Sequence, residues 1–136
     1  MSGNEAQEKV IFTVLFVDDE PNILRAIKRA LFTLDINLLL AESGAKALEL
    51  LSSQDVHVVI SDMKMPQMSG AELLEQVALR YPDTFRVVLT GYADIESTIK
   101  AVNQGKIHRY LQKPWDNQEL IRVIEEGLER VKLKAE

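Results

Sequence analysis

Five polar side chains in this 136-residue sequence could carry out chemistry together if the fold brings them to one place. They are the carboxylates Asp18, Asp19 and Asp62, the hydroxyl of Thr90 and the ammonium of Lys113. Three adjacent carboxylates repel one another unless a cation neutralises them. Hard oxygen ligands without His or Cys favour Mg²⁺ or Mn²⁺ over zinc. Because Mg²⁺ often shares its remaining coordination sites with phosphate oxygens, the set suggests phosphate chemistry.

Short apolar runs precede these polar residues and predict the strands that must position them. The runs cover residues 10–17, 36–41, 56–61, 85–90 and, more weakly, 108–112. Most are too continuously apolar for half-exposed strands, so they are expected to be covered on both faces. The acids at 18–19 follow the first run, Asp62 follows the third, Thr90 ends the fourth and Lys113 follows the fifth.

Amphipathic helical patterns lie between the apolar runs. In the fourth of these patterns, Ile95, Ile99 and Val102 share one side and are expected to face the core. Five strand–helix alternations with short connections predict an α/β fold, a doubly wound parallel sheet with helices on both faces. Ligands of such sheets bind beyond the carboxyl ends of the strands. The five polar side chains are therefore expected to meet at one edge of the sheet.

Composition excludes several classes of function. The chain is 46% hydrophobic and 27% charged, with a net charge of −5, which fits one compact domain. No apolar run approaches the roughly 20 residues that span a bilayer, and no dense basic patch predicts binding to nucleic acid. The absence of cysteine excludes disulfides and thiolate sites and fits the cytoplasm. His57 and His108 lie within strand patterns and are interpreted as structural.

Each polar residue also has a purely structural explanation. An acid before the first helix commonly caps it, Asp62 and Thr90 can belong to turns, and a lone Lys113 can be a solvated surface charge. The occurrence of all five groups together favours a functional site, because they are expected to reach the same edge of the sheet from four different strands.

Four segments carry a family resemblance: "VDDEP", "ISDMKMPQMSG", "VVLTGYAD" and "YLQKPW", in this order. From about residue 10 to residue 133 the chain resembles the receiver domain of two-component response regulators. The resemblance implies a flavodoxin-like (βα)₅ fold with strand order 2-1-3-4-5. It implies that Asp62 is the phosphoacceptor, and that Asp18, Asp19, Asp62 and the backbone carbonyl of Lys64 bind Mg²⁺.

The same resemblance implies roles for residues on the last two strands. Thr90 and Lys113 would contact the phosphoryl group, Thr90 and Tyr110 would form a conformational switch, and the Lys113–Pro114 bond would be cis. The face made by the fourth helix, fifth strand and fifth helix would then change. That face would control an output domain or effector protein, or join two copies in a homodimer.

The resemblance also implies a signalling role. The phosphoryl group would come from a sensor histidine kinase or a phosphotransfer protein, and the domain would catalyse only its own phosphorylation and dephosphorylation. Residues 1–9 are expected to form a disordered arm, 10–133 the receiver, and 134–136 its C-terminal end, where a linker to an output domain could start. The stretch 89–120 is similar to receivers that precede signalling enzymes, including metal-dependent phosphohydrolases of the HD type.

Two other functions remain alternatives. A Mg²⁺-dependent phosphatase or phosphotransferase acting on a small molecule would use the same carboxylates. It would need a general acid two residues after Asp62, where Lys64 stands, and extra chain to build a cap. A receiver-like binding module that is not phosphorylated would not need an acid at every acceptor and metal position. Here all these positions hold the expected residues, which weighs against this alternative. The sequence contains no P-loop motif and no dinucleotide-binding glycine motif.

Overall fold

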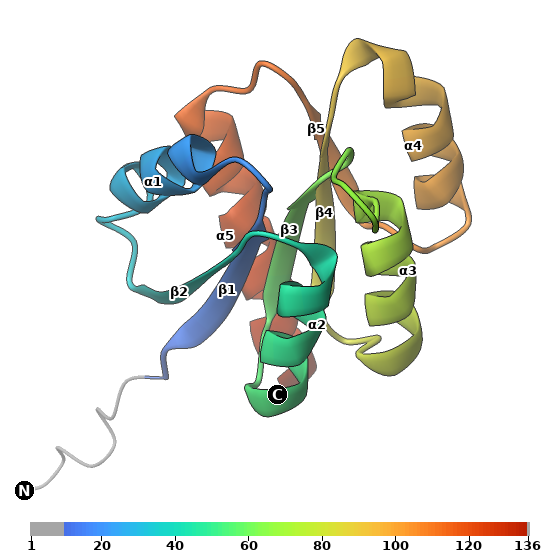
Figure 1. Cartoon of the computed structure of the whole chain (residues 1–136). Coiled ribbons are helices and arrows are strands. Elements are labelled where there is room, and N and C mark those ends of the chain that lie inside the picture. Colours follow the sequence, from blue (N-terminus) through green and yellow to red (C-terminus); the bar gives the residue numbers. More distant parts are fainter. Residues whose placement is uncertain (1–9, 136) are drawn as a thin grey trace, which may run out of the picture.

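The computed structural model describes residues 10–135, so the predicted arm 1–9 and Glu136 lie outside the described residues. The described chain forms a five-stranded parallel sheet of order β2-β1-β3-β4-β5, which confirms the predicted topology (Figure 1). The strands are β1 (Phe12–Val17), β2 (Ile36–Ala41), β3 (Val58–Asp62), β4 (Phe85–Thr90) and β5 (Arg109–Gln112). The helices are α1 (Pro21–Ala30), α2 (Gly44–Ser53), α3 (Gly70–Arg80), the 3₁₀ turn η2 (Tyr92–Asp94), α4 (Ile95–Asn103) and α5 (Asn117–Ala135).

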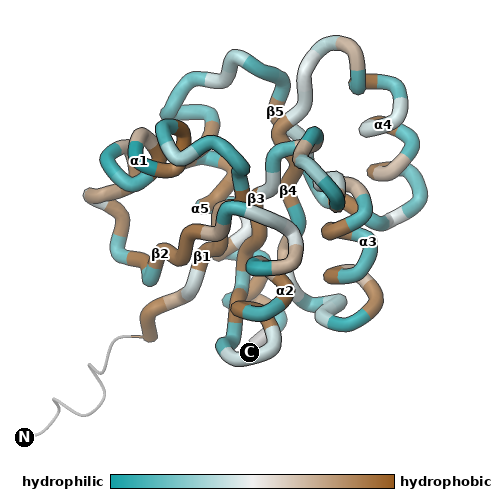
Figure 2. The backbone as a smooth tube through the Cα atoms, viewed as in Figure 1, coloured by the Kyte–Doolittle hydropathy of each residue, from teal (hydrophilic) through white to brown (hydrophobic). Residues whose placement is uncertain are grey.

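Alternate residues of the central strands pack into two hydrophobic clusters, one on each face of the sheet. Val14 and Phe16 of β1 pack with residues of α1 and α5, whereas Leu15 and Val17 pack with residues of α2 and α3. Figure 2 shows the resulting concentration of hydrophobic residues along β1 and β3. The helices thus cover both faces, as predicted for a doubly wound sheet. None of the helices in residues 10–135 combines the length and apolar character needed to cross a membrane.

Local sequence signals determine where two of the helices begin. The Ser43 hydroxyl accepts the Lys46 N–H at 3.1 Å and caps α2. Ser69 and Glu72 exchange two hydrogen bonds at the start of α3, a capping box. Such caps satisfy amide groups that have no partner within the helix.

The edge strands differ from the sequence-based expectation of full burial. Only Leu111 is buried in β5, and only Ala41 is buried in β2. The central strands β3 and β4 are buried along their whole length. An edge strand has a neighbour on one side only and is incompletely covered by helices, so its apolar residues remain partly exposed.

Helix α4 follows the predicted orientation only in part. Thr98 and Ala101 are its buried residues, whereas Ile99 is 40% exposed. The prediction that Ile95, Ile99 and Val102 all face the core was therefore wrong for Ile99. Apolar residues lie on more than one side of this helix, and the fold places the side with small residues against the sheet.

The two histidine rings form hydrogen bonds with backbone amides at the amino ends of the strands. His57 Nδ1 accepts the Thr13 N–H and His108 Nδ1 accepts the Arg86 N–H, both at 2.9 Å. These bonds occupy backbone donors at the starts of β1 and β4, and they require a neutral Nδ1. The structural interpretation of both histidines is confirmed.

Arg86 connects two loops at the amino ends of the strands. Its guanidinium is buried and donates to the carbonyl oxygens of Pro82, Thr84, Gly105 and Lys106 at 2.8–3.2 Å. Burial, with Arg130 nearby, lowers the pKa of Arg86. The four carbonyl acceptors hold the guanidinium between the loops that precede β4 and β5.

The buried environment of His108 gives the fold a defined pH dependence. Burial and then the positive charges of Arg86 and Arg130 lower the pKa of His108 from 6.5 to about 4. The unfolded chain therefore binds more protons than the fold between these pH values, so stability falls as the pH decreases through this range. Because the ring is only partly buried, we expect a loss of about 1–2 kcal/mol of stability.

Urea unfolding of the wild type and of His108→Gln at pH 7 and pH 4.5 measures this loss. Glutamine does not titrate, so the wild type should lose more stability than the variant on acidification. Other titrating groups are common to both proteins and cancel in the comparison. An equal pH dependence of the two proteins would contradict the assignment to His108.

Candidate functional site

Three carboxylates meet at the carboxyl edge of β1 and β3. Asp62 ends β3, and Asp18 and Asp19 directly follow β1, whose Val17 lies opposite Ser61. One carboxylate oxygen from each aspartate lies within 4.8 Å of the others. The parallel register thus produces the convergence that the sequence predicted.

Asp18 is held as a buried acid with one defined hydrogen bond. Its side chain is 2% exposed, and Oδ1 accepts the Glu20 N–H at 2.9 Å. Burial raises the pKa of Asp18 from 3.8 to about 6; the charges of Asp62 and Asp19 also raise it, while the Glu20 N–H and Lys113 oppose the rise. The Glu20 side chain makes no cap hydrogen bond to α1, so helix capping does not account for that acid.

Asp62 faces the ammonium of Lys113, which arrives from the end of β5. Asp62 is 5% exposed, and its Oδ1 forms an ion pair with Lys113 Nζ. Within the described residues the same Oδ1 accepts no hydrogen bond, so the contact is an ion pair without hydrogen-bond geometry. The Lys113 N–H donates to the Thr90 carbonyl at 2.8 Å, and the bond to Pro114 is cis, as predicted.

The cluster fits a divalent metal ion. Its ligands are carboxylate oxygens, one buried oxygen lacks a hydrogen bond, and burial with mutual repulsion raises the pKa of Asp18. A hard cation would stabilise such a set. Lys64 lies in the loop directly after β3, and its ammonium is 3.8 Å from Asp94 Oδ2 at the start of α4.

Thr90 ends β4 beside the carboxylates and is fully buried. Its hydroxyl donates to the Gly91 carbonyl at 3.3 Å and accepts a hydrogen bond from the Thr98 hydroxyl at 3.1 Å. All five polar residues that the sequence singled out thus follow or end strands at the same edge of the sheet, at the top in Figure 1.

The family model of the response regulator receiver domain matches residues 14–125, which is most of the chain. The chain belongs to the receiver domain family. The HoxA hydrogenase transcriptional regulatory protein of Cupriavidus necator is 36% identical over 124 residues, which cover 91% of this chain and 26% of HoxA. The receiver thus spans about a quarter of that curated relative.

Solved structures agree with this assignment. An uncharacterized protein from Neptuniibacter caesariensis is 48% identical, with a TM-score of 0.87 over 91% of this chain and 92% of the other. The signal receiver domain of an HD domain-containing protein from Pseudomonas fluorescens Pf-5 is 40% identical, with a TM-score of 0.85 over 90% and 98%. The receiver is a two-component signalling domain, and these matches give no support to the small-molecule phosphatase alternative.

Thr98 is the polar residue of the receiver site that the sequence analysis missed. It stands eight residues after Thr90, within α4, and is fully buried. Its spacing from Ala101 is helical, so a side of α4 with small residues was present in the sequence. The signal was obscured because the larger residues Ile95, Ile99 and Val102 suggested another orientation.

Tyr110 lies on β5 opposite Val88 and is 37% exposed. Its side chain is therefore only partly covered by the neighbouring elements. The exposed ring lies on the edge strand, between α4 and α5 in the order of the chain.

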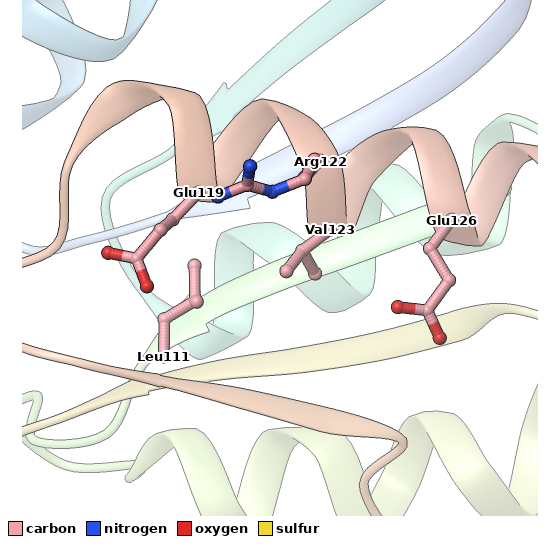
Figure 3. Close-up of a pocket in the computed structure, with 5 residues that line it drawn as sticks. All are labelled: Leu111, Glu119, Arg122, Val123 and Glu126. Atoms are coloured by element: carbon pink, nitrogen blue, oxygen red, sulfur yellow. The ribbon is translucent and has the colours of Figure 1, made fainter.

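An open hollow of about 260 Å³ lies between β5 and α5 of the receiver. Figure 3 shows its lining, which consists of Leu111 from β5 and of Glu119, Arg122, Val123 and Glu126 along α5. Arg109 of β5 forms an ion pair with Glu126 at 2.6 Å. The hollow thus combines an apolar floor with both signs of charge and lies apart from the carboxylate cluster.

Replacing Asp18 by asparagine should stabilise the metal-free receiver. A carboxyl with a pKa of about 6 in the fold and 3.8 as its ordinary value destabilises the fold as the pH rises through this range. Asparagine removes the charge and can still accept the Glu20 N–H. We expect Asp18→Asn to be more stable by roughly 2–3 kcal/mol at pH 7.5 in EDTA.

Urea unfolding with EDTA and with Mg²⁺ tests this expectation. Mg²⁺ should stabilise the wild type more than Asp18→Asn, because the variant has lost one carboxylate of the cluster. Asp55→Asn, at an exposed position, is the matched control for removal of one charge. A variant less stable than the wild type in EDTA would contradict the raised pKa of Asp18.

Proposed function

We propose that Asp62 accepts a phosphoryl group from the phosphohistidine of a sensor histidine kinase or phosphotransfer protein. The observation that carries the proposal is the buried Asp62 carboxylate, which lies between the acids Asp18 and Asp19 and the ammonium of Lys113. An acceptor needs an ionised oxygen nucleophile with positive charge where the phosphoryl oxygens will lie. This arrangement supplies both.

The transfer itself is a displacement at phosphorus. An oxygen of Asp62 forms the new O–P bond while the N–P bond of the phosphohistidine breaks, and the imidazole nitrogen leaves with the bonding electrons. Asp18, Asp19, Asp62 and the Lys64 carbonyl would hold Mg²⁺, or Mn²⁺ in its place. The bound ion would supply positive charge between the carboxylates and the phosphoryl oxygens. Lys113 adds its ammonium on the side of β5.

The product changes the hydrogen bonds around the site. A phosphoryl group adds negative charge and strong acceptor oxygens. Lys113 turns from Asp62 towards a phosphoryl oxygen, and the Thr90 hydroxyl donates to another. Each charge-assisted bond is worth about 1.5–3 kcal/mol net. Two of them bias a conformational equilibrium by a few kcal/mol, which shifts populations substantially.

The switch then involves Tyr110 and the α4-β5-α5 face. Thr90 moves towards the phosphoryl group, and the exposed Tyr110 ring moves into the space behind it. The altered face controls an output domain or effector protein, or pairs two receivers as a homodimer. The hollow between β5 and α5, with its apolar floor and charged rim, supports this face as the binding surface.

The receiver works within a longer signalling pathway in the cytoplasm. It catalyses only its own phosphorylation and dephosphorylation. The receiver includes the whole of α5, which is helical from Asn117 to Ala135. Both kinds of output are consistent with the receiver, since its relatives include the transcriptional regulatory protein HoxA and an HD domain-containing protein of Pseudomonas fluorescens.

Intact-mass measurement tests the acceptor function. The receiver is incubated with Mg²⁺ and acetyl phosphate, and the expected result is a gain of one phosphoryl group, mapped by peptide analysis to Asp62. Addition of EDTA should prevent the gain. A phosphoryl group on another residue, or none on the wild type with Mg²⁺ present, would overturn the proposal.

A further inference from the structure

A buried pair of hydroxyl groups joins helix α4 to the carboxylate edge of the sheet. Thr98 Oγ1 in α4 donates to Thr90 Oγ1 at the end of β4, with 3.1 Å between the two oxygens. Both side chains are 0% exposed. Water therefore does not compete for this bond, and a hydroxyl left without a partner here would be costly.

The direction of the hydrogen bonds follows from what a hydroxyl can do. Each hydroxyl donates one hydrogen and accepts through two lone pairs. Thr98 uses its hydrogen on Thr90, and Thr90 uses its own on the Gly91 carbonyl, at the longer distance of 3.3 Å. Thr90 can thus redirect its hydrogen to a new acceptor while its oxygen still accepts from Thr98.

Besides the ion pair of Asp94 with Lys64, helix α4 is held near its start mainly by small buried side chains. Its N-cap residue, Asp94, makes no side-chain cap hydrogen bond, and the residues before it form the 3₁₀ turn η2. Thr98 and Ala101 are its two buried residues, both small, and Ile99 is partly exposed. The hydroxyl bond is thus a direct side-chain link between the first turns of α4 and the end of β4.

We propose that Thr98 is a positioning residue that couples helix α4 to the hydroxyl of Thr90, and through it to the phosphorylation state of Asp62. The inference rests on the proposed function. When Thr90 turns its hydrogen to a phosphoryl oxygen, the bond from Thr98 persists and the start of α4 follows Thr90. Thr98 also holds Thr90 Oγ1 in place before transfer, so it affects the rate of phosphorylation through Thr90.

Two substitutions at position 98 separate the hydroxyl from the shape of the side chain. Thr98→Val keeps nearly the same shape and removes the donor, whereas Thr98→Ser keeps the donor. The readouts are the rate of phosphoryl uptake from acetyl phosphate with Mg²⁺ and the hydrogen exchange of the α4 amides with and without phosphorylation. Circular dichroism checks folding, and Thr98→Ala replaces the valine variant if that variant does not fold.

Phosphorylation of the wild type should change exchange in α4. Thr98→Val should take up the phosphoryl group about two- to tenfold more slowly, as expected for the loss of one neutral hydrogen bond. In this variant, phosphorylation should no longer change the hydrogen exchange of the α4 amides. Thr98→Ser should behave as the wild type in both. In a Thr90→Ala background, Thr98→Val should have no further effect on rate, because its partner is already absent.

The outcomes distinguish this inference from the acceptor function. If the wild type and Thr98→Val are both phosphorylated and α4 responds equally, the coupling is wrong and the acceptor function stands. Independent, additive effects of Thr90→Ala and Thr98→Val on the rate would also overturn the coupling. If the wild type takes up no phosphoryl group, the proposed function fails and the coupling fails with it.

Discussion

Asp62→Asn is expected to take up no phosphoryl group from acetyl phosphate under conditions in which the wild type is fully modified. The asparagine amide has nearly the same shape as the carboxylate but is not an ionised oxygen nucleophile. It also removes one of the three acids of the metal cluster. Intact mass in the presence of Mg²⁺ measures the loss, which should be complete.

A matched control separates this loss from a general effect of charge. Asp55→Asn changes an exposed carboxylate outside the cluster and should be phosphorylated as the wild type is. The Asp62→Asn fold should be retained, and its metal-free form should be more stable, since the Asp62 charge helps to raise the pKa of Asp18. Equal labelling of Asp62→Asn and wild type would move the acceptor to another residue.

Gly70→Ala is expected to destabilise the receiver by about 3 kcal/mol or more, although alanine is the better helix former. A Cβ on Gly70 would lie 2.1 Å from the carbonyl oxygen of Asp62 and 3.0 Å from Met63 Cα, which are both backbone atoms. The Gly70 N–H donates to the Met63 carbonyl at 2.8 Å. The start of α3 must therefore move away from the end of β3, and the Asp62 backbone must shift with it.

The control lies in the same region of the receiver. A Cβ on Gly91 meets no atom within 4 Å, and its φ of −84° suits any residue, so Gly91→Ala should change stability by less than about 0.5 kcal/mol. Urea unfolding in EDTA compares the two variants. Phosphoryl uptake by Gly70→Ala should also be slowed, because the acceptor residue moves. Equal stability of both variants would show that α3 moves aside without cost.

The sequence predicted the central part of the fold well because two independent signals agreed there. Continuous apolar runs such as the one that ends at Val17 can only be covered on both faces, and the parallel topology then brings the following acids to one edge. The prediction failed where one signal was ambiguous. Ile95, Ile99 and Val102 suggested one orientation of α4, and packing selected the side with Thr98 instead.

Contacts of long polar side chains could not be read from the sequence. The ion pair of Lys64 with Asp94 joins the loop after β3 to the start of α4, and the Arg86 guanidinium binds carbonyls of the loops before β4 and β5. Such contacts depend on distances that only the folded chain sets. Arg86 is buried although no acid among residues 10–135 forms an ion pair with it, which is unusual for arginine. Its four carbonyl acceptors explain the burial.

The two histidine bonds and the Arg86 contacts give the amino ends of the strands more polar cross-links than the carboxyl ends have. At the amino ends, imidazole and guanidinium groups tie strand starts and loops together. At the carboxyl ends, the acids repel one another and Asp62 Oδ1 lacks a hydrogen bond. We therefore expect the carboxyl end of the sheet to be the end that changes shape when its charges change, while the contacts at the amino end keep the strands together.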